Sequence, residues 1–131
     1  MKEIVLLYHI DEKTKTIIET IMSQLDVDVK YIEETQVNET IGYLLEIPGF
    51  EKDQKNEFTD VLEKEFIFFA GFSDEQLDLV LDIFKAAQVP YIPFKAMLTN
   101  DNVTYPFYRL YQNVEHEYEQ ITNGFKNEES K

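Results

Sequence analysis

Two nearly unbroken apolar runs, residues 4–10 and 66–70, stand out in the pattern of hydrophobic and polar positions. Continuous apolar runs of this length are typical of strands that are buried on both faces of a sheet. Residues 27–31 instead alternate between apolar and polar side chains, which predicts an edge strand with one face in water. A fourth strand is predicted over residues 91–98, where Pro93 cannot donate a ladder hydrogen bond and therefore indicates the other edge.

Helices are predicted between these strands over residues 12–25, 38–47 and 73–88. In each of them the apolar residues recur at the spacing that places them on one helical face. The start of the third helix is indicated by Ser73, which is followed three residues later by Gln76 in the pattern of a capping box.

A last helix is predicted to begin near Pro106, whose fixed φ and missing N–H suit a first helical turn. Its apolar residues form one stripe, which we expect to face inward as far as Tyr118 and Ile121. Asn123 and Gly124 are expected to end it.

Strand and helix alternate four times, which predicts an α/β fold: a single three-layer domain with helices on both faces of a four-stranded, mainly parallel sheet. If the two apolar strands are central and the other two are edges, the strand order is 2-1-3-4. The domain is expected to span residues 1–124. Residues 125–131 lack a core-forming pattern and are predicted to be a flexible C-terminal tail.

Charge and composition remove several classes of function. The 131 residues include 12 basic and 26 acidic side chains, a formal net charge of −14, so nucleic acid and anionic membranes are not expected as partners. Without cysteine there is no disulfide or thiolate chemistry, which favours a cytoplasmic location. No apolar run approaches the ~20 residues of a membrane-spanning helix, and we expect no signal peptide and no cofactor.

Part of the chain resembles a known family. Residues 66–77 contain an apolar strand and then Gly-Phe-Ser-Asp-Glu at a helix start, and residues 95–99 read Lys-Ala-Met-Leu-Thr, followed by Asn102 and the final helix. This arrangement resembles small bacterial proteins, common in Firmicutes, that are classed only as a domain of unknown function. The resemblance is strongest from Phe66 to Asn102, although Tyr105 stands where the family often has tryptophan. It implies no activity, substrate or catalytic residue.

A ligand site is expected where the winding of the sheet reverses, beyond the carboxyl ends of the first and third strands. His9 follows the first strand and Ser73 follows the third, so both are candidates for this crevice. A helix N-terminus at Ser73 is a general anion site, although the acidic residues of its first turn oppose it. Lys95 and Thr99, from the fourth strand and its end, complete the predicted ligand-binding set.

Each of these four residues also has a purely structural interpretation. His9 can hydrogen-bond to a nearby carbonyl group, and Ser73 can act as an N-cap alone. Lys95 can extend to water from an edge strand, where a charge discourages aggregation. Thr99 can be an ordinary turn residue.

A partner-binding surface is predicted at the start of the last helix, from Tyr105, Tyr108 and Arg109. Arg109 is the only arginine, and tyrosine and arginine are enriched among the residues that dominate protein interfaces. His116 and Glu119 share a helix face, but two ligands are too few for a metal site. No catalytic residue and no metal site are predicted.

These observations favour a non-catalytic binding or regulatory module that recognises a protein or small-molecule partner. The alternative is a sensor of a small anionic molecule, or a small enzyme, that uses His9, Ser73, Lys95 and Thr99 around the crevice.

Overall fold

The computed structural model describes the backbone over residues 1–129 and the side chains over residues 1–122. The chain divides into two compact units. The first, called here the sheet unit, comprises Met1–Glu33 and Glu63–Thr99. The second, called here the helical unit, comprises Glu34–Leu62 and Asn100–Lys131. The single domain over residues 1–124 stays a prediction.

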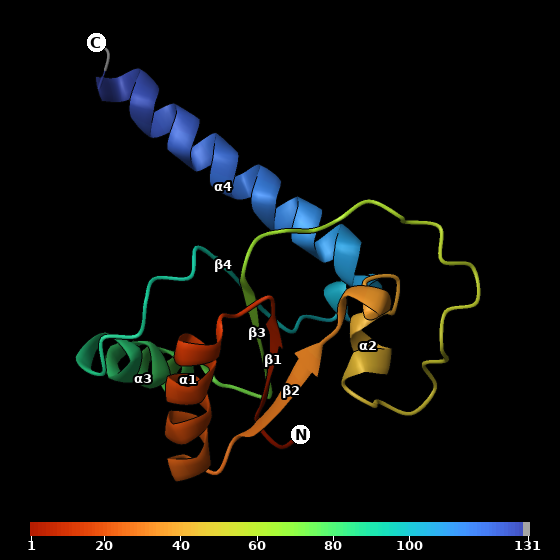
Figure 1. Ribbon diagram of the computed structural model, residues 1–131, viewed down its shortest axis with the longest axis horizontal. Coiled ribbons are helices and arrows are strands. Elements are labelled where there is room, and N and C mark those ends of the chain that lie inside the picture. Colours follow the sequence, from red (N-terminus) through yellow and green to blue (C-terminus); the bar gives the residue numbers. More distant parts are fainter. Residues whose placement is uncertain (130–131) are drawn as a thin grey trace. The chain divides into compact units, whose positions relative to one another are not determined.

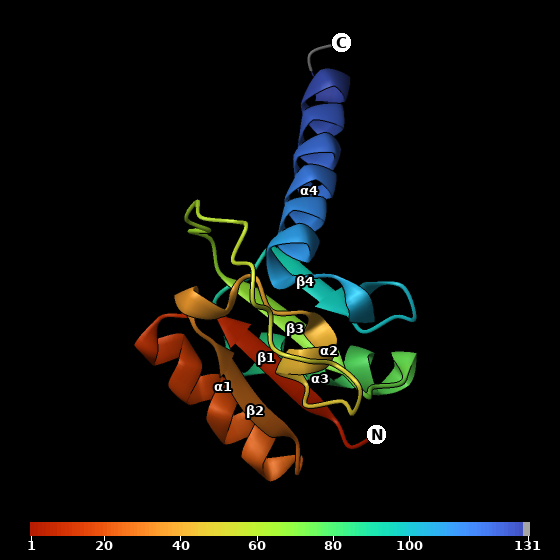
Figure 2. The same cartoon turned by 90° about the vertical axis from the view of Figure 1, so that its right-hand side faces the viewer.

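The sheet unit contains one open sheet of four strands in the order β2-β1-β3-β4, which is the predicted order (Figures 1 and 2). The α/β class is likewise confirmed. Two helices connect its parallel strand pairs. In chain order the elements are β1 (Ile4–Tyr8), α1 (Glu12–Gln24), β2 (Asp28–Ile32), β3 (Phe66–Ala70), α3 (Asp74–Ala86) and β4 (Phe94–Met97).

The two central strands run in opposite directions. β1 pairs with β2 and β3 pairs with β4 in parallel, but β1 and β3 are antiparallel, with Ile4 opposite Ala70 and Tyr8 opposite Phe66. An apolar run shows that a strand is buried on both faces and carries no information on its direction. The sheet therefore consists of two β-α-β halves that are joined by antiparallel pairing of β1 with β3.

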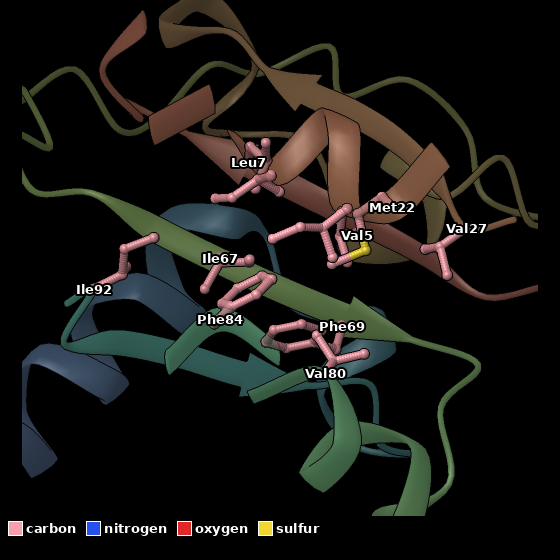
Figure 3. Close-up of a cluster of buried hydrophobic side chains, with 11 residues drawn as sticks. Val5, Leu7, Met22, Val27, Ile67, Phe69, Val80, Phe84 and Ile92 are labelled. Carbon is pink, nitrogen blue, oxygen red and sulfur yellow. The ribbon is translucent and has the colours of Figure 1, made fainter. Parts of the chain in front are cut away.

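The core of the sheet unit lies between the sheet and its two helices (Figure 3). Alternate residues of β1 and β3 face α1 and α3, and each fully buried aliphatic side chain contributes about 1.5–3 kcal/mol. The intervening residues of both strands are also buried, as the continuous apolar runs predict. Helices on the second face stay a prediction. The cluster consists of Val5, Leu7, Ile18, Ile21, Met22, Val27, Ile67, Phe69, Val80, Phe84 and Ile92.

Both helices of the sheet unit begin with side-chain caps. Asp11 caps α1 by accepting from the Thr14 N–H at 3.0 Å, and the hydrogen bonds from Thr14 lower the pKa of the Asp11 carboxyl. α3 begins with the predicted capping box, in which Ser73 Oγ accepts from the Gln76 N–H and the Gln76 side chain accepts from the Ser73 N–H. Free N–H groups at both helix starts are thus satisfied locally.

The helical unit contains η1 (Glu34–Gln36), α2 (Ile41–Leu44), η2 (Asn102–Thr104) and α4 (Phe107–Glu129). α2 is shorter than predicted at both ends, since it begins after its N-cap, Thr40, and ends before its C-cap, Leu45.

α4 begins directly after Pro106 as predicted, but it continues through Asn123 and Gly124, so the expected end of this helix is wrong. One glycine costs a helix only about 1 kcal/mol, which a long helix tolerates. The flexible tail was predicted over residues 125–131. The backbone of residues 125–129 belongs to α4, and residues 130–131 lie outside the described residues. Within the described chain, no helix combines the length and the hydrophobicity needed to cross a membrane.

Candidate functional site

The start of α4 is held in place by backbone hydrogen bonds within the helical unit. The first N–H groups of a helix have no partner inside the helix. Here the N–H of Phe107 donates to the carbonyl of Glu39 and the N–H of Tyr108 donates to the carbonyl of Val37, each at 2.9 Å. The N–H of Ile41 in turn donates to the carbonyl of Tyr105. The segment before α2 therefore fixes the position of the first turn of α4.

Tyr108 stacks face to face on Phe58, with ring centroids 4.5 Å apart and planes 4° from parallel. Phe58 belongs to the long loop between α2 and β3. The side chain of Asn38 forms hydrogen bonds with both backbone groups of Phe58. Asn38 Nδ2 donates to the Phe58 carbonyl and Asn38 Oδ1 accepts from the Phe58 N–H, both at 2.9 Å. Phe58 was not among the predicted site residues, because nothing in its local pattern indicates a partner so distant in the sequence.

Arg109 lies over the ring of Tyr105, with its guanidinium carbon 4.0 Å from the ring centroid. This is a cation–π contact on an exposed arginine. The predicted partner-binding residues thus share the start of α4 but form two separate ring contacts, Arg109 with Tyr105 and Tyr108 with Phe58. Their part in partner binding stays a prediction.

The apolar stripe of α4 changes from buried to exposed along the helix. Leu110 and Tyr111 are 5% and 2% exposed, whereas Tyr118 is 39% and Ile121 is 72% exposed. The expectation that the last two face inward is therefore wrong. Helical periodicity identifies the apolar face of a helix but does not show whether other residues cover it. Val114 lies between the two parts and is half-buried.

Acidic residues border the exposed part of this stripe. In a helix of 3.6 residues per turn, Glu117 lies beside the stripe on one side and Glu115 on the other. Glu117 is exposed and Glu115 is partly so. We call Val114, Tyr118 and Ile121, with these two glutamates, the α4 stripe.

The predicted ligand-binding residues do not form one crevice. Because β1 and β3 are antiparallel, His9 at the end of β1 lies beside the start of β3, whereas Ser73 follows the end of β3. The expectation that the two share one edge of the sheet is wrong for this reason. Thr99 follows β4, which runs parallel to β3, and so lies at the same edge as Ser73. Lys95 sits mid-strand, opposite Ile67.

The ring of His9 contacts backbone and a neighbouring ring. Its Nδ1 lies 3.1 Å from the carbonyl oxygen of Glu63, to which it donates when it carries the proton, and the ring stacks on Tyr8 at 4.2 Å. His9 also adopts a left-handed backbone conformation, with φ of 55°, which is uncommon outside glycine. These contacts fit the structural interpretation, in which the imidazole ties the end of β1 to the chain that enters β3.

Lys95 makes its contacts with the segment that precedes β4. Its Nζ donates to the carbonyl oxygen of Ile92 and lies 4.5 Å from the centroid of the Tyr91 ring. Burial lowers the pKa of the Lys95 ammonium below its usual range, because desolvation disfavours the charged form. Of the four predicted residues, Lys95 has the environment that most differs from an ordinary surface position.

His116 does not assemble a metal site with its neighbours. Its Nε2 lies 3.1 Å from Nε2 of Gln120, one turn further along α4. Over the described residues, no group of three or more His, Cys, Asp and Glu side chains is arranged to hold a metal ion.

Residues 65–121 match the family model of a domain of unknown function, DUF3783. The match confirms the resemblance over residues 66–102 and extends it to the α4 stripe. It brings no activity, substrate or catalytic residue. No match was found among curated proteins or among solved structures.

Proposed function

We propose that this chain is a non-catalytic binding module whose α4 stripe receives an amphipathic helix of a basic protein partner. The observation that carries the proposal is the exposure of Tyr118 and Ile121 on a face that is buried two turns earlier. Contiguous exposed apolar side chains rimmed by polar ones are typical of protein-binding sites. A partner helix can cover such a stripe with its own apolar face.

Charge favours a basic partner. The stripe is bordered by Glu115 and Glu117, and the chain as a whole carries a net charge of −14. Lysine or arginine beside the apolar face of a partner helix would pair with these glutamates and accelerate association. A second copy of this chain would bring equally acidic flanks together, which opposes self-association through this face.

The other features of the proposal are supported by charge and by composition. An acidic surface is repelled by phosphate backbones and anionic lipids, so nucleic acid and membranes are poor partners. A cytoplasmic location agrees with the absence of cysteine from the sequence. Tyr105, Tyr108 and Arg109 at the start of α4 are proposed as a second contact with the same partner.

The test uses the full chain and two synthetic peptides of about five helical turns. One peptide places leucine on one face and lysine on its flanks, and the other has the same composition in scrambled order. Fluorescence anisotropy should show the patterned peptide binding about tenfold more tightly than the scrambled one. Equal binding of the two would show attraction by bulk charge alone and would contradict the proposal.

Variants locate the binding face. Tyr118→Gln with Ile121→Gln should weaken binding of the patterned peptide about tenfold, because the apolar contacts are lost while helix propensity is kept. Leu79→Gln is the matched control, since Leu79 is another exposed apolar residue, on α3, and should leave binding unchanged. Arg109→Gln tests the start of α4, and it should weaken binding of the patterned peptide if Arg109 contacts the partner. Sedimentation equilibrium showing a dimer that the double variant disperses would replace the proposed partner with a second copy.

A further inference from the structure

The sheet unit contains an apolar pocket that none of the arguments above uses. It has a volume of about 320 Å³ and lies between α3, the segment that follows it and the edge strand β4. Ile67, Phe84 and Ile92 form part of its wall, and Figure 3 shows these three side chains close to one another at one side of the core. The volume is at the small end of the range of about 300–1,000 Å³ that is typical of ligand pockets.

The charged residues of the pocket are all basic. Lys85 and Lys95 line it, and no aspartate or glutamate does, in a chain whose acidic residues outnumber the basic ones by 26 to 12. The remaining lining residues are apolar apart from the hydroxyl of Tyr91. The pocket is therefore a locally basic site within an acidic protein, which selects for an anionic ligand.

Lys95 has no acidic partner within the described part of the chain. Its ammonium contacts only a carbonyl oxygen and the face of the Tyr91 ring, both of which are neutral. Burying an unpaired ammonium is unfavourable, because the charge loses its hydration. A carboxylate that binds beside it compensates for this loss with a charge-assisted hydrogen bond. Lys85 is exposed near the end of α3, where a lysine also complements the helix dipole, so Lys95 carries most of this argument.

We propose that this pocket binds a small apolar molecule that carries one carboxylate, with the carboxylate at Lys95 and Lys85 and the apolar part against Ile67 and Phe84. The carboxylate of such a ligand would pair with the lysine ammonium groups, and its hydrocarbon part would contact the apolar wall. The site involves none of the residues of the α4 stripe, so this proposal stands or falls independently of the proposed protein partner.

The test compares octanoate with octanol, which has the same hydrocarbon chain without the charge. Isothermal titration of the full chain should show octanoate binding about tenfold more tightly than octanol. Lys95→Met should remove this preference by weakening octanoate about tenfold, while octanol changes less than about twofold. The matched control is Lys52→Met, because Lys52 is an exposed lysine outside the pocket, and it should leave both affinities unchanged.

A second variant separates loss of the site from loss of the fold. Val89 lines the pocket and is only half-buried, so Val89→Trp should fill the space and abolish binding of both compounds while circular dichroism stays unchanged. Equal affinity for octanoate and octanol, or an unchanged preference in Lys95→Met, would overturn the proposal. So would binding that survives Val89→Trp, because the ligand would then lie elsewhere.

Discussion

The first and second parts of α4 have the same sequence pattern but different environments. At the start of the helix, the apolar face is buried, and the segment before α2 satisfies the free N–H groups of the first turn. Three turns later the same face is exposed and bordered by glutamates. The periodicity of a sequence thus specifies which side of a helix is apolar, whereas tertiary contacts decide which length of that side is used for stability.

The largest expected effect comes from the buried start of α4. Phe107 is fully buried, so Phe107→Ala should lower the free energy of unfolding by about 3–5 kcal/mol through the lost apolar contacts and the cavity left behind. Urea denaturation of the full chain measures this, with Tyr118→Ala as the control from the exposed part. A loss below about 1 kcal/mol, the range of ordinary substitutions, would remove the distinction between the two parts.

An intermediate effect is expected from the hydrogen bonds that support the start of α4. Asn38→Ala leaves the N–H and the carbonyl of Phe58 without their side-chain partner and should cost about 1–3 kcal/mol. Asn38→Asp keeps the acceptor for the N–H but places a carboxylate oxygen against the Phe58 carbonyl oxygen, which it repels, so it should also destabilise the protein. Hydrogen exchange at the Phe58 amide should accelerate in Asn38→Ala. An unchanged exchange rate would show that the loop is held by other contacts.

The smallest effect is expected from the exposed part. Tyr118→Gln with Ile121→Gln should change the free energy of unfolding by no more than about 0.5 kcal/mol, because exposed positions contribute little to stability. The same double variant is expected to weaken peptide binding, so stability and binding should separate. A destabilisation above about 2 kcal/mol would show that these side chains belong to the core of the helical unit.

The sequence predicts the elements and the strand order well, because both follow from local patterns. Apolar runs identify β1 and β3 as central, alternation identifies β2 as an edge, and Ser73 with Gln76 marks the start of α3. The predicted mainly parallel sheet is confirmed by the pairs β1–β2 and β3–β4. The direction of β1 relative to β3 could not be predicted, because an apolar run has the same pattern in both directions of the chain. Because the two strands are antiparallel, His9 and Ser73 lie at opposite ends of the β1–β3 pair.

The candidate sites were predicted only in part. Lys95 was recognised because a lysine is unexpected in an apolar strand, but its pocket could not be foreseen, since it depends on how α3 packs against β4. Tyr105, Tyr108 and Arg109 were selected by residue type, and their part in partner binding stays a prediction. Phe58 and the exposure of the α4 stripe depend on tertiary contacts that no local pattern encodes.

The antiparallel central pair also has a consequence for the order of folding. Each β-α-β half joins strands separated by one helix, so its contacts are close in sequence and the chain closes each loop at modest entropic cost. Pairing of β1 with β3 joins the two segments of the sheet unit across Glu34–Leu62, which is the first segment of the helical unit. Nucleation is therefore expected within the halves, with their docking along β1 and β3 as the slow step. Substitutions at that seam should alter the rate of folding, whereas substitutions that affect contacts formed after docking should alter the rate of unfolding.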